Sequence, residues 1–233
     1  GLGSPTSILQ SQLTQLTSAL TEANPTNPLQ NLTAPCVNAI IAFIGNATTC
    51  LPPSSLALLL PVLTDTDPVK KLNDLVTFAN STCSFPRCSD NIIDLGKNLT
   101  LTGCSSDIQN KNPVAIATVV VIMLYLPIMN SLCFQTPNKD YCFQETAFAL
   151  FAAPDPKFNP PLIGPGLDKF FFCNPTTFCT DCNHKISREF FGFLNDKKHA
   201  DDIAILTNFG FKDLITEVQN SIMIKCGFTF LTD

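Results

Sequence analysis

The chain has 233 residues, of which 45% are hydrophobic and 14% are charged. This length is enough for one large or two small domains with a core that needs no metal, and the high apolar content excludes an intrinsically disordered chain. The formal net charge is −5, from 19 acidic and 14 basic residues. Because nucleic-acid-binding proteins present clustered Lys and Arg, we expect no nucleic acid among the partners.

Helix patterns recur along the whole chain. An apolar stripe at three- and four-residue spacing predicts a first helix over 7–24. Asp67 followed by Pro68 predicts the N-cap and first turn of another helix. A similar stripe over 211–222 ends before Gly227, a residue typical of helix C-termini. Further helices are predicted at 36–45, 54–63, 89–101, 138–152, 177–194 and 200–208.

The longest apolar run, residues 114–126, lies between Pro113 and Pro127. The run is apolar on all sides, so we expect a central helix with other helices around it. Its β-branched residues also allow a strand, but a lone strand would leave its backbone groups unpaired in the core. As a helix the run spans about 20 Å, less than the ~30 Å of the hydrocarbon layer, so we expect no membrane span.

A proline-rich segment at 153–166 is the one candidate linker. We expect helices to pack across it and to form a single helical domain over 1–233, with a subdivision at 153–166 as the alternative. The sequence has no strand pairs joined by Asn-Gly or Asp-Gly turns. It therefore predicts an all-α fold, an irregular bundle of about nine to eleven helices around a central apolar helix, stapled by disulfides.

The cysteines and glycosylation sequons indicate a secreted protein. Eleven cysteines are spread along the chain, which favours disulfides over metal clusters. Four sequons predict N-glycosylation at Asn31, Asn46, Asn80 and Asn98. Gly1-Leu-Gly-Ser-Pro lacks the features of a signal peptide, so we expect an extracellular or cell-wall protein whose signal peptide has been removed. The sequence leaves open whether a lipid anchor was added to a processed C-terminus.

The disulfide pairing does not follow from the sequence, but short separations suggest three local bridges. Since eleven is odd, at least one cysteine stays unpaired in a monomer, or it joins two chains. The suggested local bridges are Cys83–Cys88, Cys133–Cys142 and Cys36–Cys50. The cysteines left for longer bridges or for the odd thiol are Cys104, Cys173, Cys179, Cys182 and Cys226.

Several short motifs carry a resemblance to a known family. They are Pro35-Cys36 before an apolar helix, Cys50-Leu-Pro-Pro-Ser-Ser, Cys83-Ser-Phe-Pro-Arg-Cys88-Ser, Cys104-Ser-Ser-Asp and Cys179-Thr-Asp-Cys182-Asn. Over about residues 34–195 the chain resembles fungal secreted cysteine-rich helical proteins, described as a domain of unknown function and found on or near the cell wall. The resemblance implies a fold and a location but no activity. It extends, without a residue-level match, to the pink chromoprotein of oyster mushrooms.

Catalytic and metal-binding motifs are incomplete. The C-x-x-C of Cys179 and Cys182 with His184 lacks a second half for zinc and a strand–helix context for redox chemistry, so we expect structural disulfides. A hydrolase would need a nucleophile beside His184 or His199, and Asp181 is only a sequence neighbour. We therefore expect no metal and no enzymatic activity, a hydrolase using His184 being the minority alternative. Other acidic residues are interpreted as solvated helix positions: Asp201, Asp202, Asp213 and Glu217.

Aromatic residues concentrate in the last third, where residues 158–233 hold twelve of the 19 Phe. Adjacent helical residues point about 100° apart, so the triplet 170–172 cannot pack on one core stripe. Its rings suit a second core layer, a subunit interface or the wall of an apolar pocket. Since Tyr125 and Tyr141 are the only phenols, such a pocket would have few polar anchors.

We therefore expect a secreted, non-catalytic protein that binds an apolar small molecule, such as a lipid, sterol or pigment, in a helical cavity. The alternative is a structural or interaction protein of the cell surface or cell wall. It would bind a partner, or a second copy of itself, through a Phe-rich surface or the odd cysteine. The predicted lining residues of the cavity are Val121, Leu124, Tyr125, Phe171, Phe178, Phe190 and Phe191.

Overall fold

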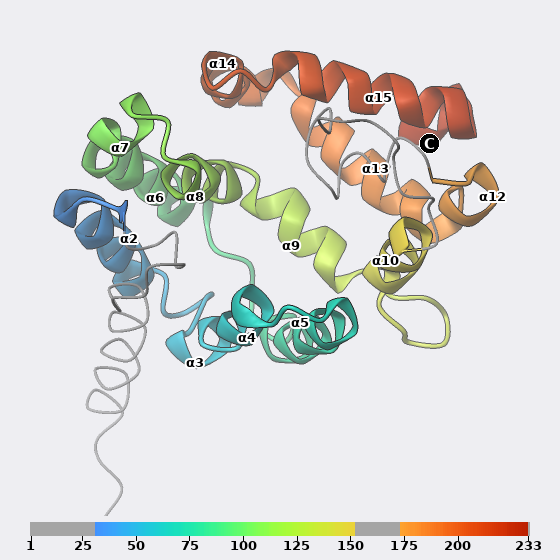
Figure 1. Cartoon of the computed structure of the whole chain (residues 1–233), viewed down its shortest axis with the longest axis horizontal. Coiled ribbons are helices and arrows are strands. Elements are labelled where there is room, and N and C mark those ends of the chain that lie inside the picture. Colours follow the sequence, from blue (N-terminus) through green and yellow to red (C-terminus); the bar gives the residue numbers. More distant parts are fainter. Residues whose placement is uncertain (1–30, 152–172, 233) are drawn as a thin grey trace, which may run out of the picture. The chain divides into compact units, whose positions relative to one another are not determined.

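The structure, a computed structural model, describes residues 31–151 and 173–232 (Figure 1). Within these ranges every regular element is a helix, apart from one isolated antiparallel bridge between Gln135 and Tyr141. The predicted all-α, disulfide-stapled fold is confirmed. The predicted helix at 7–24 and the proline-rich segment 153–166 lie outside the described residues.

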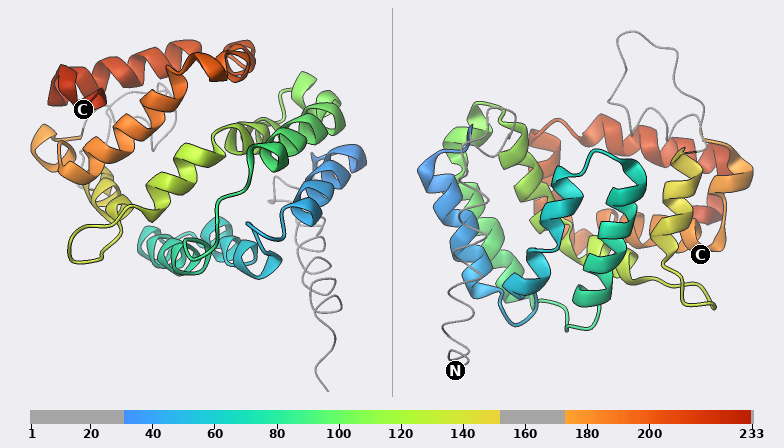
Figure 2. Two further views of the ribbon diagram at one scale, coloured as in Figure 1. Left: turned by 180° about the vertical axis from the view of Figure 1, so that it is seen from behind. Right: turned by 60° about the horizontal axis from the view of Figure 1, so that its bottom comes forward.

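The chain forms two compact units, one up to Leu126 and one from Pro127. The boundary falls within a helix, and the number of domains stays a prediction. In the first unit α2 packs on α6 and α6 on α8, while α4 and α5 lie side by side (Figures 1 and 2). The helices from this part of the chain are α2 (Ala34–Asn46), α3 (Pro53–Leu56), α4 (Leu59–Thr64), α5 (Pro68–Thr82), α6 (Asp90–Gly103), α7 (Ser105–Gln109), α8 (Pro113–Met123) and α9 (Tyr125–Cys133), which crosses the boundary.

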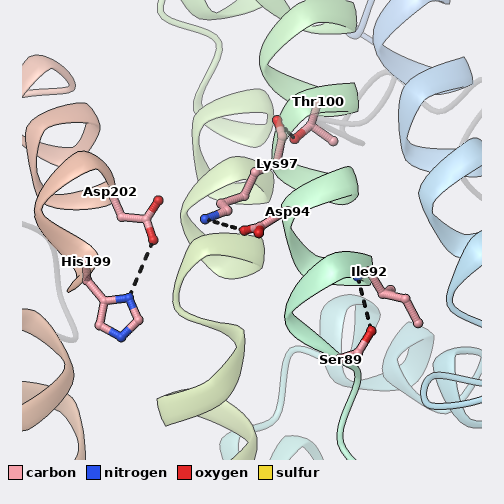
Figure 3. Close-up of polar contacts among 7 residues, drawn as sticks. All are labelled: Ser89, Ile92, Asp94, Lys97, Thr100, His199 and Asp202. Atoms are coloured by element: carbon pink, nitrogen blue, oxygen red, sulfur yellow. Dashed lines mark hydrogen bonds and ion pairs between the residues drawn. The ribbon is translucent and has the colours of Figure 1, made fainter.

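Local hydrogen bonds explain where these helices begin. The Asp67 carboxylate caps α5 by accepting the Val69 N–H at 3.2 Å, as the sequence predicts. The Ser89 hydroxyl caps α6 by accepting the Ile92 N–H at 3.3 Å (Figure 3). Asn112 caps α8 in the same way. These starts are encoded by residues within one turn, which is why the sequence locates them.

Two glycines of α6 allow α2 to approach closely. A Cβ added to Gly96 would lie 2.6 Å from the ring of Phe43. A Cβ on Gly103 would lie 2.6 Å from the Cβ of Ala39 and 2.8 Å from the backbone oxygen of Pro35. The spacing between α2 and α6 therefore depends on the absence of a side chain at both positions.

The apolar run at 114–126 is helical but is divided at Leu124 into α8 and α9. Pro127, in the first turn of α9, has no N–H with which to continue the preceding helix. Val119 is fully buried, whereas Val121 is 54% exposed, so the run is not covered on every side. No single helix of the described ranges is long and apolar enough to cross a membrane. The consecutive helices α8 and α9 reach the necessary length and apolar content only when they are counted together, and they are bent by 73° relative to each other.

In the second unit α10 packs on α13 and α12, and η3 packs on α13 and α15. The predicted helix 138–152 begins only at Cys142, because Lys139 has a positive φ of 67° in the preceding turn. The predicted helix 177–194 is interrupted at Cys179 and Thr180. Gly227 ends α15, as predicted, with a φ of 90°. Besides α9, the elements are α10 (Cys142–Phe151), α12 (Pro175–Phe178), α13 (Asp181–Leu194), η2 (Lys197–His199), α14 (Ala200–Asn208), α15 (Lys212–Cys226) and η3 (Phe228–Leu231).

The disulfides join residues that are far apart in the sequence, and the three predicted local pairings are wrong. Cys36 lies in the first turn of α2 and Cys50 follows its end, and a helix of this length holds them roughly 15 Å apart, beyond disulfide reach. Cys83 and Cys133 are disulfide-bonded as well. The bridges are Cys36–Cys104, Cys50–Cys88, Cys142–Cys182 and Cys179–Cys226.

Cys173 is the odd cysteine, and it keeps a thiol. It is 3% exposed, and burial raises the pKa of this thiol, opposed by the nearby charge of Lys225. The asparagines of the four sequons are all exposed and lie in the first unit, where a glycan would meet solvent: Asn31, Asn46, Asn80 and Asn98.

Candidate functional site

A depression in the surface of the second unit is the candidate site. Its volume is about 490 Å³ and it is open to solvent. Small-molecule sites usually measure roughly 300–1,000 Å³. Its walls come from the loop before α10, from α10 itself and from α12 with its connection to α13. The lining residues are Thr136, Asp140, Tyr141, Gln144, Glu145, Phe148, Thr177 and Thr180.

The loop before α10 is held by its own hydrogen bonds. The Thr136 N–H donates to the Asp140 carbonyl at 2.8 Å, and the Asp140 N–H donates to the Thr136 hydroxyl at 3.3 Å. At the base of the loop the Cys142 N–H donates to the Phe134 carbonyl at 2.8 Å. The positions of Thr136 and Asp140 at the site are therefore fixed by backbone pairing.

One face of α10 supplies an amide, a carboxylate and an aromatic ring. Gln144 and Phe148 lie one turn apart, with Glu145 beside them. The Gln144 Oε1 accepts the Tyr141 N–H at 3.2 Å, which leaves its NH₂ group as a donor. Phe148 is 63% exposed. The Glu145 Oε2 is buried but accepts no hydrogen bond from the residues that the structure describes.

A buried amide joins α10 to the opposite wall. Asn183, which is 1% exposed, donates from Nδ2 to the Phe178 carbonyl at 2.8 Å, and its Oδ1 accepts from the Thr146 hydroxyl. The Thr180 hydroxyl caps α13 by accepting the Asn183 N–H at 3.2 Å. Thr177 in α12 and Thr180 before α13 therefore line the depression from a wall that is anchored to α10.

Two disulfides fix the same walls. Cys142 at the start of α10 is bonded to Cys182 in the first turn of α13. Cys179, between α12 and α13, is bonded to Cys226 at the end of α15. The expected structural role of this C-x-x-C is confirmed, with a distant partner for each sulfur. A site walled by cross-linked elements loses little conformational entropy when a ligand binds.

Tyr141 forms the inner part of the lining. It is 8% exposed and stacks on Phe143, with ring centroids 5.4 Å apart. Burial raises the pKa of the Tyr141 phenol. The group therefore stays a neutral hydroxyl at ordinary pH.

The chemistry of the depression is mixed. Two carboxyl groups, three Thr hydroxyls, an amide and a phenol surround an exposed Phe ring, and none of the eight lining residues is Lys, Arg, His or Cys. Such a lining accepts hydrogen bonds from a ligand and offers it one apolar surface. It carries no His or Cys that could act as a base or thiol nucleophile for hydrolysis.

The residues predicted to line an apolar cavity fall in both units. In the first unit Leu124 is half-buried, and the Tyr125 hydroxyl accepts the Cys88 N–H at 2.9 Å. In the second unit Phe178 and Phe191 lie in the hydrophobic core, and Phe190 is half-buried. Phe171 lies outside the described residues. For Phe178 and Phe191 packing alone accounts for burial, and the predicted cavity stays a prediction.

The two histidines make packing contacts. The His184 ring stacks on Phe230 with centroids 4.9 Å apart, and its Nε2 is buried without a hydrogen bond in the described ranges. The His199 ring lies 3.7 Å from that of Phe193, and its Nδ1 lies 3.9 Å from the Asp202 carboxylate (Figure 3). Asp202 was expected to be solvated, but it is only 8% exposed beside His199.

Sequence reasoning missed most of this site. It singled out Tyr141 as one of two phenols, but it assigned no role to Asp140, Glu145 or the threonines. The residues near 140 and near 180 are remote in sequence, and only the packing of α10 on α13 joins them. A Thr as N-cap of a helix and a carboxylate on its surface are ordinary features, so nothing in the sequence marked them.

Comparison with known proteins supplies a family but no activity. A family model described as a domain of unknown function matches residues 19–232. No curated protein and no solved structure matches the chain. Within residues 31–151 and 173–232, no group of three or more His, Cys, Asp or Glu side chains is placed to hold a metal ion.

Proposed function

Because the chain belongs to the DUF7729 family, whose description states no activity, we propose its function from the geometry of the second unit. It is a secreted, non-catalytic binding protein, and its ligand binds in the depression between the 136–141 loop, α10 and the α12–α13 connection. The observation that carries the proposal is the fixed, mixed lining of this depression. Two disulfides and the buried Asn183 hold its walls in place before a ligand arrives.

The proposed location rests on covalent chemistry. Several disulfides are compatible with an extracellular protein, because cytosolic thiols are kept reduced. The four exposed sequon asparagines support passage through the secretory pathway and predict glycans on the first unit. Fungal origin and a relation to a chromoprotein belong to the same proposal and rest on the sequence resemblance alone.

The ligand proposed here carries polar groups as well as an apolar face. A purely apolar molecule would cover Asp140, Glu145 and the Thr hydroxyls without pairing them, and an unpaired buried polar group costs free energy. A lipid, sterol or pigment, as expected from the sequence, would need the apolar cavity that the sequence predicts. The depression, with its mixed lining, is a different site.

The experiment is native mass spectrometry of the purified full chain, combined with extraction and an absorbance spectrum. We expect a co-purifying or added small molecule that binds one per chain, and we expect Phe148→Ala to weaken it. Phe85→Ala, which removes an exposed ring of the first unit outside the depression, is the control. Equal binding by both variants and the parent chain would contradict the assignment of the depression.

A second candidate function is self-association. Ile224 in the last turn of α15 is 85% exposed, and Phe228 at the start of η3 is 79% exposed. Large apolar side chains that are exposed close together in the chain favour a protein interface. We expect Ile224→Ser with Phe228→Ser to convert a dimer into a monomer in light scattering. A monomeric parent chain at the highest soluble concentration would remove this candidate.

A further inference from the structure

We infer that the depression is a saccharide subsite that takes the end of a neutral oligosaccharide, with one ring stacked on Phe148 and its hydroxyls bound by the surrounding oxygen atoms. This inference rests on the proposed function, because it names the ligand class of the same site. Three features of the lining carry it.

The first feature is the aromatic platform. Phe148 projects from α10 at the depression and is 63% exposed, although every other wall residue there is polar or phenolic. A pyranose ring has one face made largely of C–H groups, and that face packs on an aromatic ring through apolar contact and weak C–H interactions. A flat apolar surface within a polar site suits a molecule with one apolar and one hydroxylated side.

The second feature is the excess of hydrogen-bond acceptors. Asp140 and Glu145 accept only, when ionised, while Thr136 and Thr180 both donate and accept, and the Gln144 NH₂ group donates. Sugar hydroxyls can donate to the carboxylates and accept from the amide at the same time. The buried Glu145 Oε2 accepts no hydrogen bond within the described part of the chain, and a ligand hydroxyl would pair it.

The third feature is charge. The two carboxylates have no Lys, Arg or His beside them in the lining. Phosphorylated or carboxylated sugars would therefore be repelled, because their charge has no partner there. A neutral glycan meets no such penalty, and its many hydroxyl donors match the lining better than a single amine would.

The test measures binding of the full-length protein to soluble tetrasaccharides by calorimetry and by saturation-transfer NMR. The neutral probes are cellotetraose, maltotetraose and tetra-N-acetylchitotetraose, the anionic probe is glucose 6-phosphate, and the cationic probe is the glucosamine tetramer. We expect at least one neutral tetrasaccharide to bind and the phosphate to give no signal. Stronger binding of the cationic tetramer alone would overturn the inference in favour of an amine site.

Matched variants place the binding site. Phe148→Ala and Glu145→Gln should each lower the affinity for the neutral tetrasaccharide about tenfold, and Phe85→Ala, which removes an exposed ring of the first unit, should leave it unchanged. Circular dichroism and the disulfide map check that each variant folds. An affinity that neither Phe148→Ala nor Glu145→Gln alters would overturn the assignment of the site.

The failure of this inference is distinguishable from the failure of the proposed function. If no saccharide binds but another small molecule does, and Phe148→Ala weakens it, the saccharide class is wrong and the binding function holds. If Phe148→Ala affects no ligand at all, both are wrong. Release of new reducing ends from a bound tetrasaccharide would support the subsite and overturn the non-catalytic assignment.

Discussion

Thr33 and Asp107 are joined by two hydrogen bonds across 74 positions of the sequence. The Thr33 N–H donates to the Asp107 Oδ1 at 2.9 Å, and the Thr33 hydroxyl donates to Oδ2 at 2.7 Å. Thr33 is the N-cap of α2 but makes no side-chain cap of its own. Asp107 in α7, which is 3% exposed, instead accepts the N–H and the hydroxyl of this cap residue and fixes the start of α2.

Removal of this carboxylate should destabilise the first unit. Asp107→Ala leaves the Thr33 N–H and hydroxyl unpaired and should lower the free energy of unfolding by about 2 kcal/mol. Thr33→Val removes only the hydroxyl bond and should cost about half as much. Urea denaturation followed by circular dichroism measures both, and a parent-like midpoint for Asp107→Ala would contradict this role of the carboxylate.

The close approach of α2 and α6 gives a second prediction. Gly103→Ala places a Cβ 2.8 Å from the backbone oxygen of Pro35, which cannot move aside, and should cost about 1–3 kcal/mol. Gly192→Ala in α13 meets nothing within 4 Å and should instead stabilise its helix by up to about 1 kcal/mol. Chemical denaturation measures the change in the free energy of unfolding for both variants. If Gly103→Ala and Gly192→Ala changed it in the same direction, the packing argument would be wrong.

The bridge at the depression can be tested against a bridge in the other unit. Cys142→Ser with Cys182→Ser opens a bridge of separation 40, and Cys36→Ser with Cys104→Ser opens one of separation 68. Each double variant should lose about 4 kcal/mol by loop entropy. Only the first pair should also weaken ligand binding, measured by calorimetry at a temperature where both variants are folded. An equal loss of binding in both double variants would show that the Cys142–Cys182 bridge has no specific role at the site.

A carboxyl pair makes stability depend on pH. A hydrogen bond with Asp65 raises the pKa of Asp74 above its usual value of 3.8, assisted by burial and by the charge of Asp65 and opposed by Lys70. The folded state therefore binds this proton more tightly than the unfolded state. The contribution to stability is complete below pH 3.8 and is lost as the pH rises through the higher folded value.

Asp74→Asn should remove this dependence, because an amide keeps a donor for Asp65 and has no proton to lose. The measurement is the free energy of unfolding of the parent and the variant at a series of pH values between 3 and 7. We expect the difference between them to change in favour of the variant as the pH rises. A constant difference would contradict the shared proton.

Features that depend on neighbours in the chain were predictable. The caps at Asp67 and Gly227 and the helices near 36–45, 89–101 and 200–208 agree with the structure, because caps and apolar stripes act within one or two turns. The misplaced starts near 138 and 177 reflect turns whose hydrogen bonds, such as Thr136 with Asp140, are set by the fold.

The pairing of the cysteines and the assembly of the site were not predictable. Cys36 bonds Cys104 because α2 and α6 pack together, and the loop-entropy preference for a short ring has no effect when a rigid helix separates the nearer cysteines. The burial of Phe178 and Phe191 likewise depends on the packing of α13 against η3.

The amino-acid sequence by itself determined that this chain folds as helices, where most of them begin, and that its cysteines form disulfides, because each of these follows from local propensity or from the chemistry of one residue type. Tertiary structure alone decided which cysteines meet, which rings are buried, and that Asp140, Glu145 and Thr180 surround one depression. Those relationships depend on which helix faces pack together, and that choice minimises the free energy of the whole unit, not of any single segment.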